Sequence, residues 1–203
     1  MSASRSAATF WKWVADHQLE LRAVIGESMT GEEPVLDALL EALHAYDEDL
    51  FYLMGGDPAE MVELIITAEG NLEAFPAVRK LIDAAPALPG WEFVAFKPPM
   101  GFDFVMRHER ATIDGKTAWF QPLTTPSGNF GLRLACDGYL EEADDDFVYA
   151  AEMLLEAGVG ELAAFHIRGI DVVRTPESPR TSGFLPLNEL EDYVASRAAS
   201  LPS

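Results

Sequence analysis

Cysteine is almost absent from this chain, because Cys136 is the only one among 203 residues. That scarcity excludes an intramolecular disulfide and a zinc site made of cysteines, and a reducing compartment fits it best. No stretch comes near the run of about 18 apolar residues that spans a membrane. The N-terminal residues also lack an apolar run of signal-peptide length. We therefore expect a cytoplasmic protein.

Basic residues are scarce as well, with 14 lysines and arginines against 34 acidic residues and a formal net charge of −20. No lysine or arginine lies between Arg22 and Arg79, and none lies from Leu134 to Ile167. Such a charge repels nucleic acid and anionic membranes and attracts basic proteins, cations or cationic ligands. A compositional bias that serves solubility is the alternative explanation.

Specific catalytic motifs are missing. The sequence contains no G-x-S-x-G elbow, no Walker loop and no Rossmann fingerprint. His44, Asp47 and Glu48 have a spacing that could hold a metal on one helical face, but the second histidine of an HExxH pattern is absent. Cys136 ends a predicted strand, so we expect a buried, inert thiol. The sequence predicts no catalytic residue, no metal and no cofactor.

Apolar residues make up 49% of the chain, which is enough to bury a sizeable core. Residues 1–7 are small and polar and are expected to form a disordered tail. Residues 8–203 are expected to form a single α+β domain, with halves at 48–110 and 111–175. Mixed sheets are predicted, together with two N-terminal helices and a C-terminal helix.

The order strand, strand, helix, strand is predicted twice, which suggests a duplicated unit. Ahead of it we expect a helix over residues 9–25, with a break near Gln18, and a second helix that begins at Pro34. The first repeat comprises strands 50–54 and 61–67, helix 72–85 and strand 91–97. The second comprises strands 116–123 and 129–136, helix 144–157 and strand 161–173. Another strand at 102–107 and a final helix at 187–199 complete the prediction.

The segment ELIITAEGNLEAFPAVRKLIDAAPALPGWEFVAFKPPMGFDF, from Glu63 to Phe104, resembles the signature segment of a family of uncharacterised bacterial proteins. The Gly160-Glu161 turn and the strand expected after it resemble that family too. This resemblance implies a shared fold and supplies no activity.

The leading functional hypothesis is a non-enzymatic binding or regulatory protein that presents an acidic face to a basic protein partner. The residues expected on that face belong to the second helix and its flanks: Glu32, Glu33, Asp37, Glu41, Asp47, Glu48 and Asp49.

Two alternatives stay open. One is a small enzyme or ligand-binding domain with a pocket near the start of the helix at residue 72; its candidate residues are Glu69, Asn71, Trp91, Lys97 and Asp103. Asn71 is also suited to cap that helix, and Trp91 to pack in the core. The other alternative is a homodimer through an open sheet face, so the chain is expected to be a monomer or a homodimer.

Overall fold

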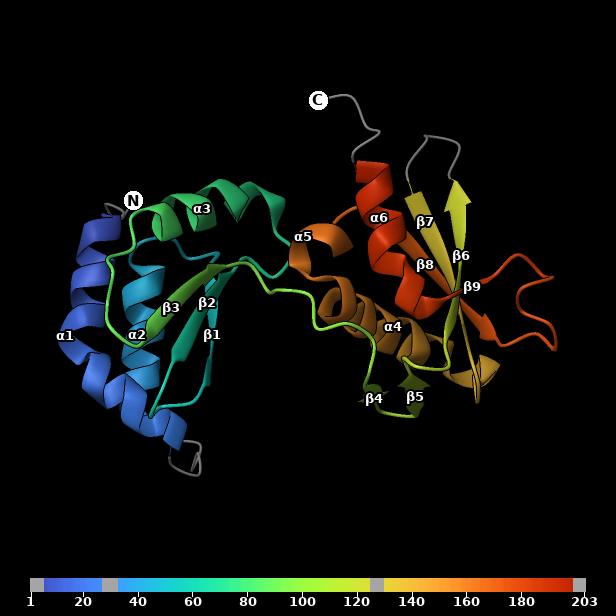
Figure 1. Ribbon diagram of the computed structural model, residues 1–203, viewed down its shortest axis with the longest axis horizontal. Helices are drawn as coiled ribbons and strands as arrows, with labels where there is room; N and C mark the ends of the chain where they lie inside the picture. Colours follow the sequence, from blue (N-terminus) through green and yellow to red (C-terminus); the bar gives the residue numbers. More distant parts are fainter. Residues whose placement is uncertain (1–5, 27–32, 125–129, 199–203) are drawn as a thin grey trace. The chain divides into compact units, whose positions relative to one another are not determined.

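The computed structural model describes residues 6–26, 33–124 and 130–198, which form two compact units that divide between Lys97 and Pro98 (Figure 1). Each unit has its own core of buried apolar side chains. The sequence predicted one domain over 8–203 with a boundary between residues 110 and 111, so the observed division falls earlier in the chain. Residues 1–5 of the predicted tail lie outside the described residues, and Ala7 already belongs to the first helix.

The first unit packs helices against a three-stranded sheet of order β1-β2-β3. β1 runs antiparallel to β2, and β2 runs parallel to β3, with α3 as the crossover between the parallel strands. Its elements in chain order are α1 (Ala7–Gly26), α2 (Pro34–His44), β1 (Phe51–Gly56), β2 (Val62–Thr67), η1 (Leu72–Ala74), α3 (Phe75–Asp83) and β3 (Trp91–Ala95).

Helix α1 is continuous, so the predicted break near Gln18 was wrong. The reason is that Leu21 continues the buried stripe of Phe10 and Val14, which holds the second half of the helix against the same core. On this core side the Trp11 Nε1 donates a hydrogen bond of 2.7 Å to the carbonyl oxygen of Leu81 in α3. α1 and α3 therefore cover the same face of the sheet.

Among the described residues of the first unit, no helix covers the opposite face of this sheet (Figure 1). The strand register aligns Leu53 with Ile65 and Ile65 with Val94. Because side chains alternate between faces, these three residues point away from the buried Leu64. Leu53 is 46% exposed, and the other two are half-buried.

The second unit contains a two-stranded sheet, β4-β5, and a four-stranded sheet of order β8-β7-β6-β9. β7 is antiparallel to β6 and parallel to β8, and α4 lies between β7 and β8 in the chain. Its elements are β4 (Val105–His108), β5 (Ala111–Asp114), β6 (Trp119–Thr124), β7 (Phe130–Cys136), η2 (Glu141–Ala143), α4 (Asp144–Val159), α5 (Glu161–Ala164), β8 (Ile167–Arg174), β9 (Leu185–Pro186), η3 (Leu187–Glu189) and α6 (Leu190–Ala198).

Three strands predicted in this unit begin later than expected. The strand expected over 116–123 begins at Trp119, because residues 115–117 form a turn. The strand expected over 161–173 begins only at Ile167, because residues 161–164 form the short helix α5, as suits the helix-forming sequence Glu-Leu-Ala-Ala. The strand expected at 102–107 begins at Val105, since Phe102 instead packs into the core of the second unit, close to Gly158.

The fold is α+β with mixed sheets, and the helices expected at both ends of the chain are present, so the predicted class is confirmed. Both units contain two antiparallel strands, a helix and a third strand parallel to the second: β1-β2-α3-β3 and β6-β7-α4-β8. A common origin of the two units by duplication stays a prediction.

Candidate functional site

An acidic stripe follows one side of helix α2. Glu33 precedes the helix, and Asp37 and Glu41 follow at intervals of four residues, which places the three on one side of it. Asp37 and Glu41 are exposed, while the buried Leu39 and Leu43 hold the helix to the core. Pro34 at the first helical position fixes where the helix begins. Glu32, which we also predicted for this surface, lies outside the described residues.

Three more carboxylates follow the C-terminal end of α2. Asp47 is half-buried, and its Oδ1 accepts a hydrogen bond of 3.1 Å from the backbone N–H of Asp49. Glu48 and Asp49 are exposed. We define the acidic surface as the described members of the predicted set: Glu33, Asp37, Glu41, Asp47, Glu48 and Asp49. The acids of helix α2 are thus followed directly in the chain by the acids of the next turn.

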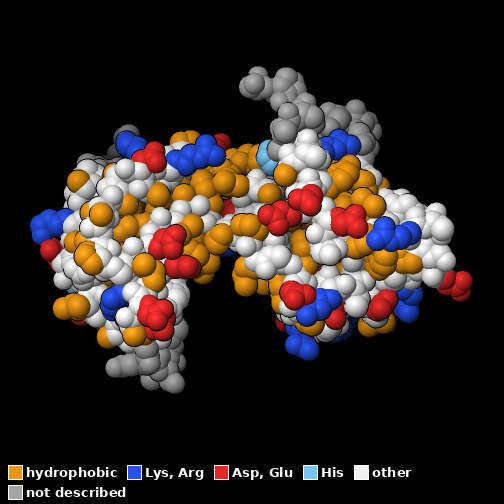
Figure 2. Space-filling model, in the orientation of Figure 1, with side chains coloured by type: hydrophobic (Ala, Val, Ile, Leu, Met, Phe, Trp, Pro, Cys, Tyr) orange, Lys and Arg blue, Asp and Glu red, His pale blue; other side chains and the backbone are white. Residues whose placement is uncertain are grey.

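Three acids of this surface have no basic partner within the described residues. Ion pairs on other elements join acids to their bases, such as Asp16 to Lys12 and Asp171 to Arg133. Asp37, Glu41 and Glu48 have no such partner within the described part of the chain. In the view of Figure 2, carboxylates lie in separate groups among apolar side chains on both units.

A second polar cluster lies where the parallel strands β2 and β3 end. The Lys97 Nζ is 2.8 Å from the Glu69 Oε2, and the Asn71 side chain accepts a hydrogen bond from the backbone N–H of Glu73. Glu69 and Phe96 both have positive φ angles, 49° and 67°. Carboxyl ends of parallel strands are where open α/β sheets commonly bind ligands, and strained residues gather at such sites.

The other two residues predicted for this pocket lie elsewhere. Trp91 begins β3 and aligns with Val62 at the start of β2, so the strand separates it from Lys97 by more than about 13 Å. Asp103 belongs to the second unit, where its Oδ1 is 3.1 Å from the Lys116 Nζ at the edge of a cavity of about 360 Å³. Glu69, Asn71 and Lys97 are therefore the members that the first unit brings together.

The sequence did not reveal an apolar cavity beside β1. Its volume is about 370 Å³, and it is lined by α1, α2 and β1 through Val24, Ile25, Leu36, Tyr52, Leu53 and Met54. The Tyr52 hydroxyl donates a hydrogen bond of 2.9 Å to the Leu36 carbonyl oxygen. Burial, and secondarily the nearby Asp37 carboxylate, raise the pKa of Tyr52. The one signal in the sequence was the absence of charge from residues 50–56.

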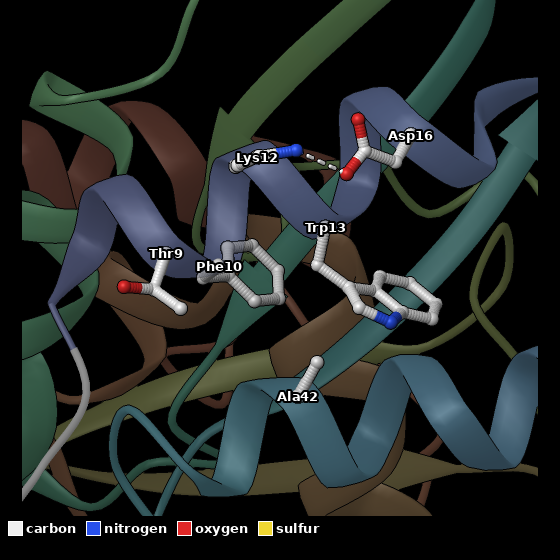
Figure 3. A pocket seen from close by; sticks show the side chains of 6 residues that line it. All are labelled: Thr9, Phe10, Lys12, Trp13, Asp16 and Ala42. Carbon is white, nitrogen blue, oxygen red and sulfur yellow. Dashed lines mark hydrogen bonds and ion pairs between the residues drawn. The ribbon is translucent and has the colours of Figure 1, made fainter.

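A smaller cavity of about 210 Å³ lies between α1 and α2 (Figure 3). Phe10 and Trp13 point toward α2 and Ala42, while Lys12 and Asp16, which also line the cavity, form an ion pair with each other. The Trp13 ring stacks on His17 with centroids 4.2 Å apart. Lys12 already pairs with a carboxylate, so among the described residues that line this groove its charge is not free for a ligand.

Metal and thiol chemistry receive no support from the geometry. Within the described residues, no group of three or more His, Cys, Asp or Glu side chains is arranged to hold a metal ion. In the same part of the chain, no helix is long and apolar enough to cross a membrane. Cys136 is buried, as predicted. Burial, and secondarily the charge of Asp137, raise the pKa of its thiol to about 12, so the reactive thiolate is scarce near neutral pH.

Comparison of the chain with known protein families, with curated proteins and with solved structures gave no match. The resemblance of residues 63–104 to uncharacterised bacterial proteins therefore stays a prediction, and the site must be interpreted from its own geometry.

Proposed function

We propose that this protein is a non-enzymatic binding module that holds a basic protein partner against the acidic surface of its first unit. The observation that supports the proposal most is that Asp37, Glu41 and Glu48 are exposed and have no ion pair within the described residues. Lysines or arginines of a partner would supply the missing counter-charges. We place this interaction in the cytoplasm, with the chain as a monomer or a homodimer.

The expected contribution of the acidic surface is mainly kinetic. Single exposed ion pairs stabilise a complex by only about 0.2–1 kcal/mol each, since water screens them. A group of like charges, however, steers an oppositely charged partner and raises its association rate, and salt weakens this effect. The surface would thus select basic partners and speed their capture.

The test is capture of proteins from a native cell lysate at low and high salt by the immobilised chain. The first variant carries Asp37→Lys, Glu41→Lys and Glu48→Lys. A matched control carries Asp137→Lys, Glu152→Lys and Glu177→Lys, which change the net charge equally at exposed positions of the second unit. We expect basic proteins to be retained at low salt by the native chain and by the control. Equal retention by the first variant would contradict the proposal.

A second candidate is a small-molecule site at the carboxyl ends of β2 and β3. The observations in its favour are the ion pair between Glu69 and Lys97 and the positive φ angles of Glu69 and Phe96. A thermal-shift screen of anionic metabolites would test it, with Lys97→Met as the variant. A compound that raises the melting temperature of the native chain but not of this variant would favour the ligand site. The absence of such a compound would count against it.

A homodimer through the open sheet face is a third hypothesis. Light scattering coupled to size-exclusion chromatography decides between monomer and dimer. Val94 lies on the open face. If the chain is a dimer and the Val94→Lys substitution dissociates it, the dimer interface lies on that face.

A further inference from the structure

Strand β1 is an edge strand of the first sheet. Within the described residues it pairs with β2 alone, in a regular ladder over six residue pairs from Phe51–Thr67 to Gly56–Val62. Its sequence, Phe-Tyr-Leu-Met-Gly-Gly, contains no charge and no proline. Edge strands normally carry lysine, proline or a bulge, because their free N–H and C=O groups otherwise invite pairing with another chain. β1 is therefore open to the addition of a strand.

The apolar cavity adjoins this edge strand. Tyr52, Leu53 and Met54 all line it, so three consecutive residues of β1 form one of its walls. Its other walls come from α1 and α2. A strand added beside β1 would place apolar side chains in this cavity.

Carboxylates lie near both the cavity and the strand. Asp37 is close enough to Tyr52 to raise its pKa, although burial raises it more. Asp49 lies two residues before Phe51, the first residue of β1. A segment that adds beside β1 would thus contact apolar walls and nearby negative charges. This surface favours a segment in which apolar residues alternate with lysine or arginine. A second copy of this chain, with its own net charge of −20, would be repelled.

We propose that an extended, basic segment of the partner protein pairs with β1 as a fourth strand and places its apolar side chains in the adjoining cavity. This inference rests on the proposed function, for which it supplies the mode of binding. Backbone hydrogen bonds to β1 give affinity, the cavity selects apolar side chains, and the acidic surface selects the charge.

The first experiment measures binding of a fluorescent peptide of four Lys-Val repeats to the full chain by anisotropy at low salt. Its twin has the same side chains and charge but is methylated at every backbone nitrogen, so it cannot donate hydrogen bonds to β1. Because several net hydrogen bonds are lost, we expect the twin to bind at least about tenfold more weakly.

The outcomes separate the two proposals. Equal binding of both peptides, lost on reversal of Asp37, Glu41 and Glu48, overturns strand pairing and leaves the acidic surface standing. Binding of the unmethylated peptide alone, unaffected by that charge reversal, supports pairing with β1 and overturns the role of the acidic surface. Failure of both peptides to bind at low salt overturns both proposals.

The second experiment compares Leu53→Lys with Met61→Lys. The two side chains are almost equally exposed, at 46% and 45%, but only Leu53 lies on β1 and lines the cavity. We expect Leu53→Lys to weaken peptide binding about tenfold, while Met61→Lys changes it only by the shared gain of positive charge. Equal effects of the two substitutions would contradict docking at β1. A homodimer dissociated by Leu53→Lys but not by Val94→Lys would overturn the proposal in favour of self-pairing through β1.

Discussion

At the residue scale, Trp91 shows that a large aromatic named as a ligand candidate can be a core residue. Its side chain is 7% exposed, and its ring stacks on Phe93 with centroids 6.0 Å apart. We expect Trp91→Ala to lower the free energy of unfolding by about 3–5 kcal/mol, since the cavity adds to the lost burial. Urea unfolding followed by circular dichroism measures the change. A loss below about 1 kcal/mol with an intact fold would indicate a binding residue instead.

Cys136 gives a prediction about alkaline pH. Burial raises the pKa of its thiol from 9.0 to about 12 in the folded chain, so the folded state holds this proton more tightly than the unfolded state. Its contribution to stability is complete below pH 9 and is lost as the pH rises toward 12. Between pH 9 and 12 the native chain should lose stability more steeply than the Cys136→Ala variant.

Chemical denaturation at a series of pH values measures this difference between the two proteins. The tyrosines affect both chains alike, which makes the variant a direct control. Parallel stability curves, or rapid reaction of a thiol reagent with the folded native chain near neutral pH, would show that Cys136 is accessible.

At the scale of single elements, the acidic stripe on α2 costs the helix stability. Asp37 and Glu41 are like charges one turn apart, and Glu41 lies near the C-terminal end, where the helix dipole favours a cation. We expect Glu41→Lys to stabilise the chain by about 0.2–0.5 kcal/mol and to weaken binding of basic proteins. Glu41→Gln should give a smaller gain. Thermal unfolding of the three proteins checks this order, and a loss of stability in Glu41→Lys would contradict it.

Helices and strands could be predicted from the sequence wherever a local pattern determines where they begin and end. Helix α2 starts at Pro34 as expected, and β2 ends at Thr67 as expected, because proline and the apolar spacing act locally. α5 was missed since a short apolar run suits a helix or a strand equally well. The cavity beside β1 was not predictable, because its walls from α1, α2 and β1 meet only through tertiary packing.

The candidate site was also predictable only in part: its local features follow from the sequence, and its tertiary contacts do not. Exposed acids on α2 follow from helical spacing, and the cap made by Asn71 follows from its position before Leu72. The ion pair of Glu69 with Lys97 depends on the parallel pairing of β2 with β3, which brings residues 28 positions apart together. Trp91 lies away from Lys97 because it begins the strand that Lys97 follows.

At the scale of the whole molecule, the two cores predict two cooperative units. The core of the first unit lies wholly within residues 1–97, and that of the second within residues 98–203. We expect a fragment of residues 1–97 to fold alone, with dispersed amide resonances and a cooperative thermal transition. A fragment that stays unfolded, although the full chain unfolds in a single transition, would support the predicted single domain over residues 8–203 instead.

The acidic surface is the centre of this account, and its most direct test is the rate of association with a basic protein captured from the lysate. Stopped-flow measurements over a series of salt concentrations compare the native chain with Asp37→Lys, Glu41→Lys and Glu48→Lys combined. Screening shortens the reach of exposed charges to about 8 Å at physiological ionic strength. We predict that the native rate falls steeply with salt, while the variant associates slowly at every salt concentration. Equal rates with equal salt dependence would contradict the account.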